Sequence, residues 1–178
     1  DPLDGTKEFI KRNDEFTVNI ALIENQEPIL GVVAVPVSGV VYYGGKNLSV
    51  FKRVAGRQLP VTSNQEPATD NRLSTDNRQL TTRIVASRSH MNKETEEYIA
   101  KLEEIEVVSA GSSLKFMLLA EGKADIYPRF GPTMEWDTAA AHAILKAIGF
   151  RVTKVDSDEE LTYNKENLLN PYFIARRP

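Results

Sequence analysis

Cysteine is absent from this sequence of 178 residues, and histidine occurs only twice, at His90 and His142. Without cysteine the chain can form no disulfide bond, no thiolate metal site and no cysteine nucleophile, and its composition fits a reducing compartment. A zinc site would have to rely on imidazole ligands. Any bound metal is therefore better matched to carboxylate ligands, which favour Mg²⁺.

An excess of either charge is also missing. The 22 basic and 25 acidic side chains give a formal net charge of −3, and the two signs are interspersed. This balance provides no electrostatic footprint for nucleic acid and no polybasic patch for a membrane surface. No apolar run approaches the length of a transmembrane helix, and the first residues do not resemble a signal peptide. We therefore expect no nucleic-acid partner and no transmembrane segment.

The sequence opens on a short motif, Asp-Pro-Leu-Asp-Gly-Thr at 1–6, with two carboxylates three residues apart. Pro2 has a fixed φ and disfavours helical backbone in the residue before it, and Gly5 permits a tight turn. Two carboxylates on a rigid turn, followed by small residues with available N–H groups, suit a hard cation bound together with a phosphate. Taken alone, such a motif is more often an ordinary turn.

A second acidic segment, Trp-Asp-Thr-Ala-Ala at 136–140, lies far along the chain. We predict that Asp137 is the N-cap of a helix that Gly149 terminates. A capping role does not require a carboxylate, because Ser or Asn would serve as well. If the fold brings Asp137 against Asp1 and Asp4, three like charges meet, which is costly without a cation between them. The two segments together therefore indicate a metal site.

Hydroxyls and cations that could contact a phosphate follow in the second half of the chain. Residues 112–115, Ser-Ser-Leu-Lys, stand at a predicted helix start, which is favourable for phosphate, although a capping serine and a solvated lysine are the more ordinary outcome. Arg129 lies on a stiff segment that suits phosphate recognition. His90 follows a predicted strand, where α/β proteins bind ligands. We expect His142 to pack within a helix or to be partly exposed.

A hydrophobic content of 41% permits a buried core, and the apolar patterns divide the chain into two parts. In the first part, strands are predicted at 16–23, 28–35 and 40–43, and short turns join them into an antiparallel sheet. A polar stretch at 56–80 indicates a surface loop.

In the second part strands alternate with helices, which is typical of a layered α/β domain. The strands are expected at 83–87, 106–108 and 124–127, and the helices at 93–104, from 112 to about 121, and from 137 to Gly149. We therefore expect the end of a first domain at 1–52, a linker at 53–82 and an α/β domain at 83–178.

The two acidic segments together resemble the metal-binding pair of the inositol-monophosphatase-like, lithium-sensitive phosphatase superfamily. Within it, Lys-Glu-Phe-Ile at 7–10, Gly-Ser-Ser-Leu-Lys-Phe at 111–116 and Tyr-Pro-Arg-Phe-Gly-Pro-Thr at 127–133 resemble the bacterial 3′(2′),5′-bisphosphate nucleotidases. The likeness covers nearly the whole chain apart from 52–82. It implies an α+β fold, the layered αβαβα sandwich of the inositol-monophosphatase type, here with part of an antiparallel sheet followed by an α/β domain.

The resemblance also implies roles for the motif residues. Asp1 would bridge metal ions, the carbonyl of Leu3 would bind one of them, and Asp4 and Asp137 would hold another. Gly5 and Thr6 would bind the scissile phosphate through backbone N–H groups, and the Thr6 hydroxyl would help orient the attacking water. Asp4 and Thr6 are thus the implied catalytic residues. The implied substrate contacts are Leu3, Asp4, Gly5, Thr6, His90, Ser112, Lys115, Arg129 and Asp137.

The implied activity is Mg²⁺-dependent removal of the 3′-phosphate from 3′-phosphoadenosine 5′-phosphate (PAP), which gives AMP and belongs to sulfur assimilation. Two or three Mg²⁺ ions would neutralise the phosphoryl oxygens and polarise the water. The implied partner is therefore a small nucleotide bisphosphate. Inositol-monophosphate hydrolysis is the alternative among enzymes, and a nucleotide-binding fragment without catalysis is the alternative outside them.

The superfamily places a metal-binding Glu, usually in a Glu-Glu pair, well before its Asp-Pro-Leu-Asp motif, whereas this sequence starts at Asp1. We therefore expect an N-terminal truncation and an inactive isolated chain. The implied location is the cytoplasm, and a peripheral position on the cytoplasmic face of the inner membrane is left open.

Overall fold

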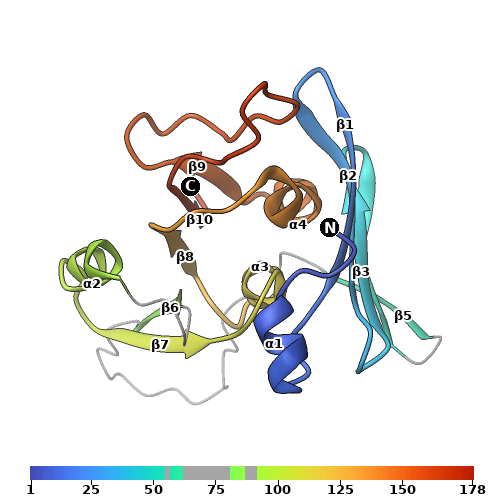
Figure 1. The fold of residues 1–178 in the computed structure, drawn as a ribbon, viewed down its shortest axis with the longest axis horizontal. Helices are drawn as coiled ribbons and strands as arrows, with labels where there is room; N and C mark the ends of the chain where they lie inside the picture. The colour runs from blue at the N-terminus through green and yellow to red at the C-terminus, as the bar shows by residue number, and fades with distance from the viewer. Residues whose placement is uncertain (55–56, 62–80, 87–91) are drawn as a thin grey trace, which may run out of the picture.

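Residues 1–54, 57–61, 81–86 and 92–178 are described by the computed structural model, and they form two sheets with helices between and beside them (Figure 1). In the described residues the first sheet has the strand order β1-β2-β3-β4-β5, and the second has the order β7-β6-β8-β10-β9. This layered α+β architecture confirms the predicted fold class.

The strands of the first sheet are β1 (Val18–Glu24), β2 (Glu27–Val35), β3 (Val40–Gly45), β4 (Leu48–Val54) and β5 (Arg57–Pro60). Those of the second sheet are β6 (Thr82–Ala86), β7 (Ile105–Ser109), β8 (Ile126–Arg129), β9 (Arg151–Lys154) and β10 (Phe173–Arg176). The helices are α1 (Thr6–Lys11), α2 (Lys93–Ile99), α3 (Leu114–Ala120) and α4 (Glu135–Ala147).

The first sheet is antiparallel throughout, as the hairpin pattern predicted. Asn25 and Gln26 join β1 to β2 with φ values of 50° and 63°, and positive φ at both residues is the geometry of a tight hairpin turn. Alternation along the strands directs Val33, Val35 and Tyr42 to a buried face. This face forms one wall of the core.

The second sheet mixes parallel and antiparallel pairs. β6 pairs in parallel with both β7 and β8, and the helices α2 and α3 lie in the connections that parallel strands require. β10 lies antiparallel between β8 and β9. Phe173 of β10 packs with Phe116 of α3 and Tyr127 of β8, whose ring centroids each lie 5.8 Å from its own.

Helix α4 lies between the two sheets, and its side chains contribute to a core that both sheets share (Figure 1). Alanines at 139–141 and 143 are buried, and these small side chains let the helix approach the strands closely. The approach is tightest at Gly31 of β2, because an added Cβ would lie 1.9 Å from the backbone oxygen of Ala140. The division of the chain into 1–52 and 83–178 stays a prediction.

Some elements differ from the prediction. β5 lies within the stretch predicted as a loop. It was missed because all its side chains are exposed and lack an apolar alternation. Residues 56 and 62–80 of that stretch lie outside the described residues. Helix α2 ends at Ile99 instead of Glu104, because the chain turns at 100–104, where Glu104 has a φ of 48°. The prediction also lacked α1, β4, β9 and β10. No helix of the described ranges is long and apolar enough to cross a membrane.

Candidate metal and phosphate site

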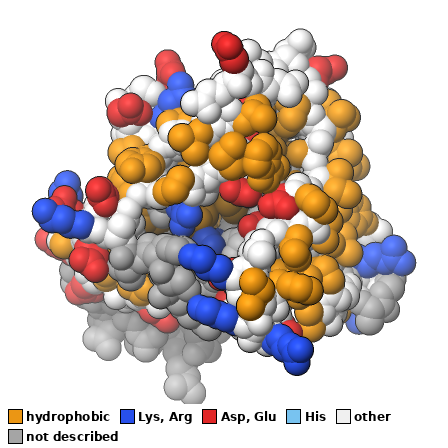
Figure 2. Space-filling model, in the orientation of Figure 1, with side chains coloured by type: hydrophobic (Ala, Val, Ile, Leu, Met, Phe, Trp, Pro, Cys, Tyr) orange, Lys and Arg blue, Asp and Glu red, His pale blue; other side chains and the backbone are white. Residues whose placement is uncertain are grey.

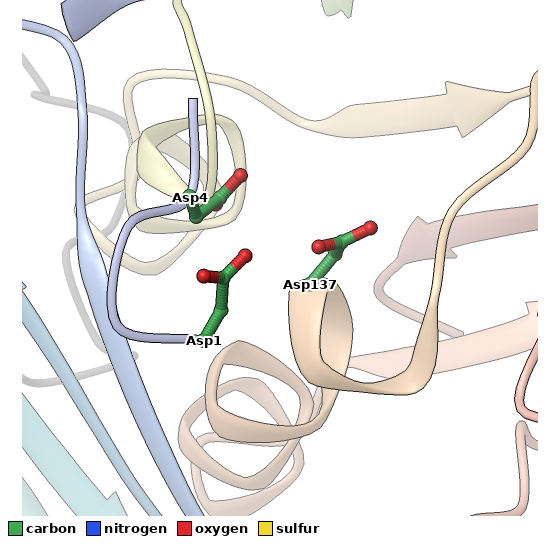
Figure 3. Close-up of side chains that lie close together, drawn as sticks. All are labelled: Asp1, Asp4 and Asp137. Carbon is green, nitrogen blue, oxygen red and sulfur yellow. The ribbon is translucent and has the colours of Figure 1, made fainter. Parts of the chain in front are cut away.

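Three carboxylates meet where the N-terminal segment passes the first turn of α4. Figure 3 shows Asp1 and Asp4 on the segment before α1 and Asp137 on the helix, with the three side chains directed into one space. One oxygen from each carboxylate lies within 4.8 Å of the others, and all three residues are half-buried. The structure therefore brings together the two acidic motifs that are far apart in the sequence.

Backbone pairing beside β1 holds the N-terminal segment in place. The backbone nitrogen of Asp1 donates to the carbonyl of Asn19 and the nitrogen of Asn19 donates to the carbonyl of Asp1, both at 2.8 Å. Asp4 and Thr17 exchange the same pair of hydrogen bonds at 2.9 Å. The two carboxylates thus stand on a short antiparallel ladder, which fixes their backbone positions.

Gly5 ends this ladder and turns the chain into α1. Its φ of 88° lies in the left-handed region that favours glycine. Thr6, the first residue of α1, has an exposed side chain two positions after Asp4. The Leu3 N–H donates to Asp1 Oδ1 at 2.8 Å, a local bond typical of Asp in turns. This is the tight turn that the Asp-Gly sequence predicted.

The Asp4 carboxylate is held by hydrogen bonds from three other residues. Its Oδ2 accepts the Thr17 hydroxyl at 3.1 Å and the Asn19 side-chain N–H at 3.1 Å. It also accepts the backbone N–H and the hydroxyl of Ser113, both at 2.7 Å. Thr17, Asn19 and Ser113 are buried, so this polar cluster joins the first sheet to the start of α3 inside the protein.

The position of Asp137 corrects the sequence prediction. Met134, and not Asp137, is the N-cap of α4, and Asp137 is the third helical residue, where its Oδ2 accepts the Met134 N–H at 2.8 Å. A carboxylate at this position satisfies the same free N–H groups as a cap, so the sequence pattern did not separate the two. Burial raises the pKa of Asp137, and the Asp4 carboxylate raises it further, against the opposing effect of the Met134 bond.

Beside the carboxylates lies a cavity of about 90 Å³. It is lined by Asp4, Ser112, Lys115, Phe116, Tyr127, Arg129, Thr133, Asp137, Thr138 and Phe173. The fold therefore brings Ser112, Lys115 and Arg129 to the same cavity as two of the carboxylates. Figure 2 shows acidic side chains in the middle of this face of the molecule, with basic side chains nearby and apolar ones on either side.

Lys115 and Arg129 form a cationic pair in this cavity. Lys115 is only 7% exposed, and burial lowers its pKa to about 8, against the opposing effect of the Asp4 carboxylate. Arg129 lowers this pKa as well, which places its charge near the lysine. Arg129 donates from Nη2 to the Pro132 carbonyl at 3.2 Å, and its buried Nε has no partner among the described residues. A cationic pair with an unused donor suits an anion.

We expect Lys115→Met to stabilise the ligand-free protein at neutral pH. Folding lowers the lysine pKa from 10.5 to about 8, so between these values the unfolded chain binds more protons and stability rises with pH. Below the folded pKa the buried charge costs up to about 3 kcal/mol, and methionine removes this cost. Urea unfolding should show a more stable variant at pH 7 and a smaller difference at pH 10. A variant less stable than wild type at pH 7 would contradict this expectation.

The other predicted side chains have different outcomes. The Ser112 hydroxyl donates to the Glu15 carbonyl at 2.7 Å, and α3 has no side-chain cap from Ser113. His90 lies outside the described residues. His142 is fully buried and its Nδ1 lies 2.9 Å from the Tyr163 hydroxyl, and burial lowers its pKa to about 3. His142 is therefore a neutral packing residue, as expected from its helix.

Sequence analysis missed the residues that hold Asp4. Thr17 and Asn19 stand two positions apart on a strand, so both side chains point to the same face. Two polar side chains on a face that packs inward need partners, and this was the signal that could have identified them. Ser113 was considered as a helix cap and as part of a phosphate site, but not as a residue that holds Asp4. The aromatic residues that line the cavity lie far apart in the sequence, and no local sequence pattern predicts that they meet.

The fold and the site define an α+β protein in which three carboxylates that could hold a cation lie beside a cationic cavity. The profile of the Inositol monophosphatase family matches residues 1–174. The chain belongs to this family, and the family indicated by the motifs is confirmed.

Curated relatives point in the same direction. The 3′(2′),5′-bisphosphate nucleotidase CysQ of Salmonella typhimurium is 48% identical over 176 residues, and that of Escherichia coli K12 is 47% identical over the same length. Each alignment covers 97% of this chain and 65% of the relative. The chain therefore spans slightly less than two thirds of the length of these relatives.

Solved structures show the same fold. The crystal structure of CysQ from Bacteroides thetaiotaomicron, described as a bacterial member of the inositol monophosphatase family, matches with a TM-score of 0.83 and 48% identity. That match covers 99% of this chain and 68% of the other. The crystal structure of inositol monophosphate-bound SaIMPase-II matches with a TM-score of 0.75 and 19% identity, covering 99% of this chain and 63% of the other, and supports the fold alone.

Proposed function

We propose that this chain supplies metal-binding and substrate-binding residues of a Mg²⁺-dependent phosphatase that removes the 3′-phosphate of PAP to give AMP. The observation that carries the proposal is the position of the three-carboxylate cluster against the cavity of Lys115 and Arg129. The CysQ relatives are named as 3′(2′),5′-bisphosphate nucleotidases, and the proposal extends that activity to this protein. PAP recycling in sulfur assimilation and a cytoplasmic location are part of the same proposal.

Asp1, Asp4 and Asp137 would hold Mg²⁺, with the Leu3 carbonyl as a further ligand and two or three ions in total. The donor set fits this metal, because carboxylate and carbonyl oxygens are the ligands it prefers. The raised pKa of Asp137 reflects burial and repulsion from Asp4, and a cation between the carboxylates would relieve that repulsion. When bound, the metal would neutralise the phosphoryl oxygens and activate water.

Gly5 and Thr6 would bind the scissile phosphate through their backbone N–H groups. Both residues directly follow Asp4 in the chain, at the left-handed turn of Gly5. The exposed Thr6 hydroxyl would help orient the attacking water, and Asp4 and Asp137 would contact the same phosphate through the metal. These groups bind and orient the reactants, which is the main contribution of the protein to phosphoryl transfer.

Lys115 and Arg129 would bind the second phosphate of the substrate. Both line the same cavity as Asp4 and Asp137, so a molecule with two phosphates could reach the carboxylate cluster and the cationic pair together. An inositol monophosphate has no second phosphate for the pair. Ser112 would contact the nucleotide from the cavity wall, and the contact proposed for His90 rests on its motif alone.

Competing substrates test this proposal. With the purified full-length protein and Mg²⁺, we expect phosphate release from PAP to exceed that from inositol 1-phosphate by at least about tenfold in kcat/KM. The reason is that hydrogen bonds to charged groups contribute roughly 1.5–3 kcal/mol each. A preference for inositol phosphate would overturn the substrate assignment. Calorimetry with AMP, measured beside phosphate release, separates an enzyme from a chain that binds the nucleotide without turnover.

Arg129→Ala is expected to raise KM for PAP roughly 10- to 100-fold, with a smaller effect on kcat, because a remote phosphate contributes binding energy without reacting. Hydrolysis of a small monophosphate should change little. The matched control is Arg53→Ala, which removes an exposed arginine from β4. Equal losses on both substrates would mean that Arg129 serves the scissile phosphate or the fold instead.

A further inference from the structure

Each carboxylate of the cluster in Figure 3 has one oxygen that the protein itself already occupies. Asp1 Oδ1 accepts the Leu3 N–H, and Asp137 Oδ2 accepts the Met134 N–H, both at 2.8 Å. Asp4 Oδ2 accepts four hydrogen bonds. Within the described part of the chain, the second oxygen of each carboxylate accepts none of these hydrogen bonds and is available to a cation.

Asp4 is the most strongly held of the three. Its four donors come from Thr17, Asn19 and Ser113, which are 0%, 5% and 1% exposed. Turning the carboxylate so that both oxygens faced a metal would leave these buried donors without an acceptor, which is unfavourable. Asp4 is thereby kept in one orientation.

Ser113 links this carboxylate to the third ligand. Its hydroxyl lies 2.7 Å from Asp4 Oδ2 and 3.1 Å from the carbonyl oxygen of Asp137, and it accepts the Asn19 side-chain N–H at 2.8 Å. One buried hydroxyl thus connects the β1 edge, the start of α3 and the first turn of α4. Without this hydroxyl, Asp4 would be held less firmly in its orientation and at its distance from Asp137.

We infer that Asn19 and Ser113 are positioning residues that hold Asp4 as a one-oxygen ligand, and that this arrangement favours Mg²⁺ over Ca²⁺. The inference rests on the proposed function, because it requires the cluster to bind a cation. Mg²⁺ demands a near-octahedral shell at about 2.0–2.1 Å and usually keeps several waters, whereas Ca²⁺ takes six to eight oxygens at about 2.3–2.6 Å and accepts bidentate carboxylates. An Asp4 carboxylate that offers one oxygen matches the first ion better than the second.

Calorimetric titration of the 178-residue protein with MgCl₂ and, separately, CaCl₂ tests this inference. Ser113→Ala and Asn19→Ala each remove a different donor to the same oxygen of Asp4. In each variant we expect the Mg²⁺ affinity to fall roughly tenfold, as the loss of outer-shell contacts to metal ligands does. The Ca²⁺ affinity should fall by less than about threefold or rise, because the released oxygen can join a larger shell.

Thr153→Ala is the matched control, because it removes a hydroxyl that is 4% exposed on β9, outside the cluster. It should leave the ratio of the two affinities unchanged. If wild type binds both ions and neither cluster variant changes that ratio, the inference fails while the metal site stands. If wild type binds neither ion, the metal assignment fails together with the inference. Should one cluster variant not fold, the other decides the result.

Discussion

In the full-length protein, Asp137→Asn is expected to remove divalent-cation binding and, with it, phosphatase activity, while the fold remains intact. Asp137 presents one oxygen to the Met134 N–H and lies with Asp1 and Asp4 in the cluster. Asparagine keeps an acceptor for that N–H but lacks the charge that a hard cation requires. We expect the Mg²⁺ affinity to fall at least about 100-fold, and kcat/KM for PAP to fall by a similar or larger factor.

Thermal unfolding separates this effect from a loss of stability. Mg²⁺ should raise the Tm of wild type, because a ligand of the folded state stabilises it by mass action, and should leave the Tm of the variant unchanged. Without Mg²⁺ the variant should be at least as stable as wild type at neutral pH. The pKa of Asp137 is raised in the folded state, so wild type loses stability as the pH rises through this pKa and the carboxylate ionises. The difference in stability between wild type and variant should therefore disappear in acid, where Asp137 is protonated.

The matched control for this substitution is Asp156→Asn, which neutralises an exposed aspartate outside the site. It should bind Mg²⁺ and turn over PAP as wild type does. Near-normal turnover of Asp137→Asn at low Mg²⁺ would contradict the proposed role. It would mean that Asp137 only accepts the free N–H group at the N-terminus of α4.

The acidic cluster was predictable because each half of it is a local signal. Asp1 and Asp4 stand on a turn that Pro2 and Gly5 define in sequence, and Asp137 stands near a helix start. The predicted N-cap of α4 was wrong by three residues. Met134 occupies the cap position although its side chain is not polar. Local rules thus identified the side chains but not how each is held.

The hydrogen bonds that orient Asp4 could not be predicted in the same way. Ser113 lies 109 residues from Asp4 in sequence, and only the packing of α3 against the first sheet brings the two together. The short strands β9 and β10 were missed for a related reason. Each has four residues, too few for a pattern to stand out, and their pairing is set by the aromatic core that they cover.

The second large effect is expected at Gly31, a residue with no part in the proposed chemistry. Gly31→Ala should destabilise the protein by about 3 kcal/mol, at the upper end for overpacking. The new Cβ would lie 1.9 Å from the Ala140 backbone oxygen and 2.8 Å from its carbonyl carbon. Both are main-chain atoms of α4, so no flexible side chain can move aside and the helix itself has to leave β2.

Because α4 carries Asp137, the same displacement should separate Asp137 from Asp1 and Asp4 and lower the Mg²⁺ affinity roughly tenfold or more, since small errors of position are costly at such sites. Urea unfolding and calorimetry measure the two effects. Gly131→Ala is the control, because its Cβ would meet nothing closer than 3.6 Å and should leave stability unchanged or raise it by up to about 1 kcal/mol. A Gly31→Ala protein with wild-type stability and wild-type Mg²⁺ affinity would mean that α4 can move away from β2 without disturbing the carboxylate cluster.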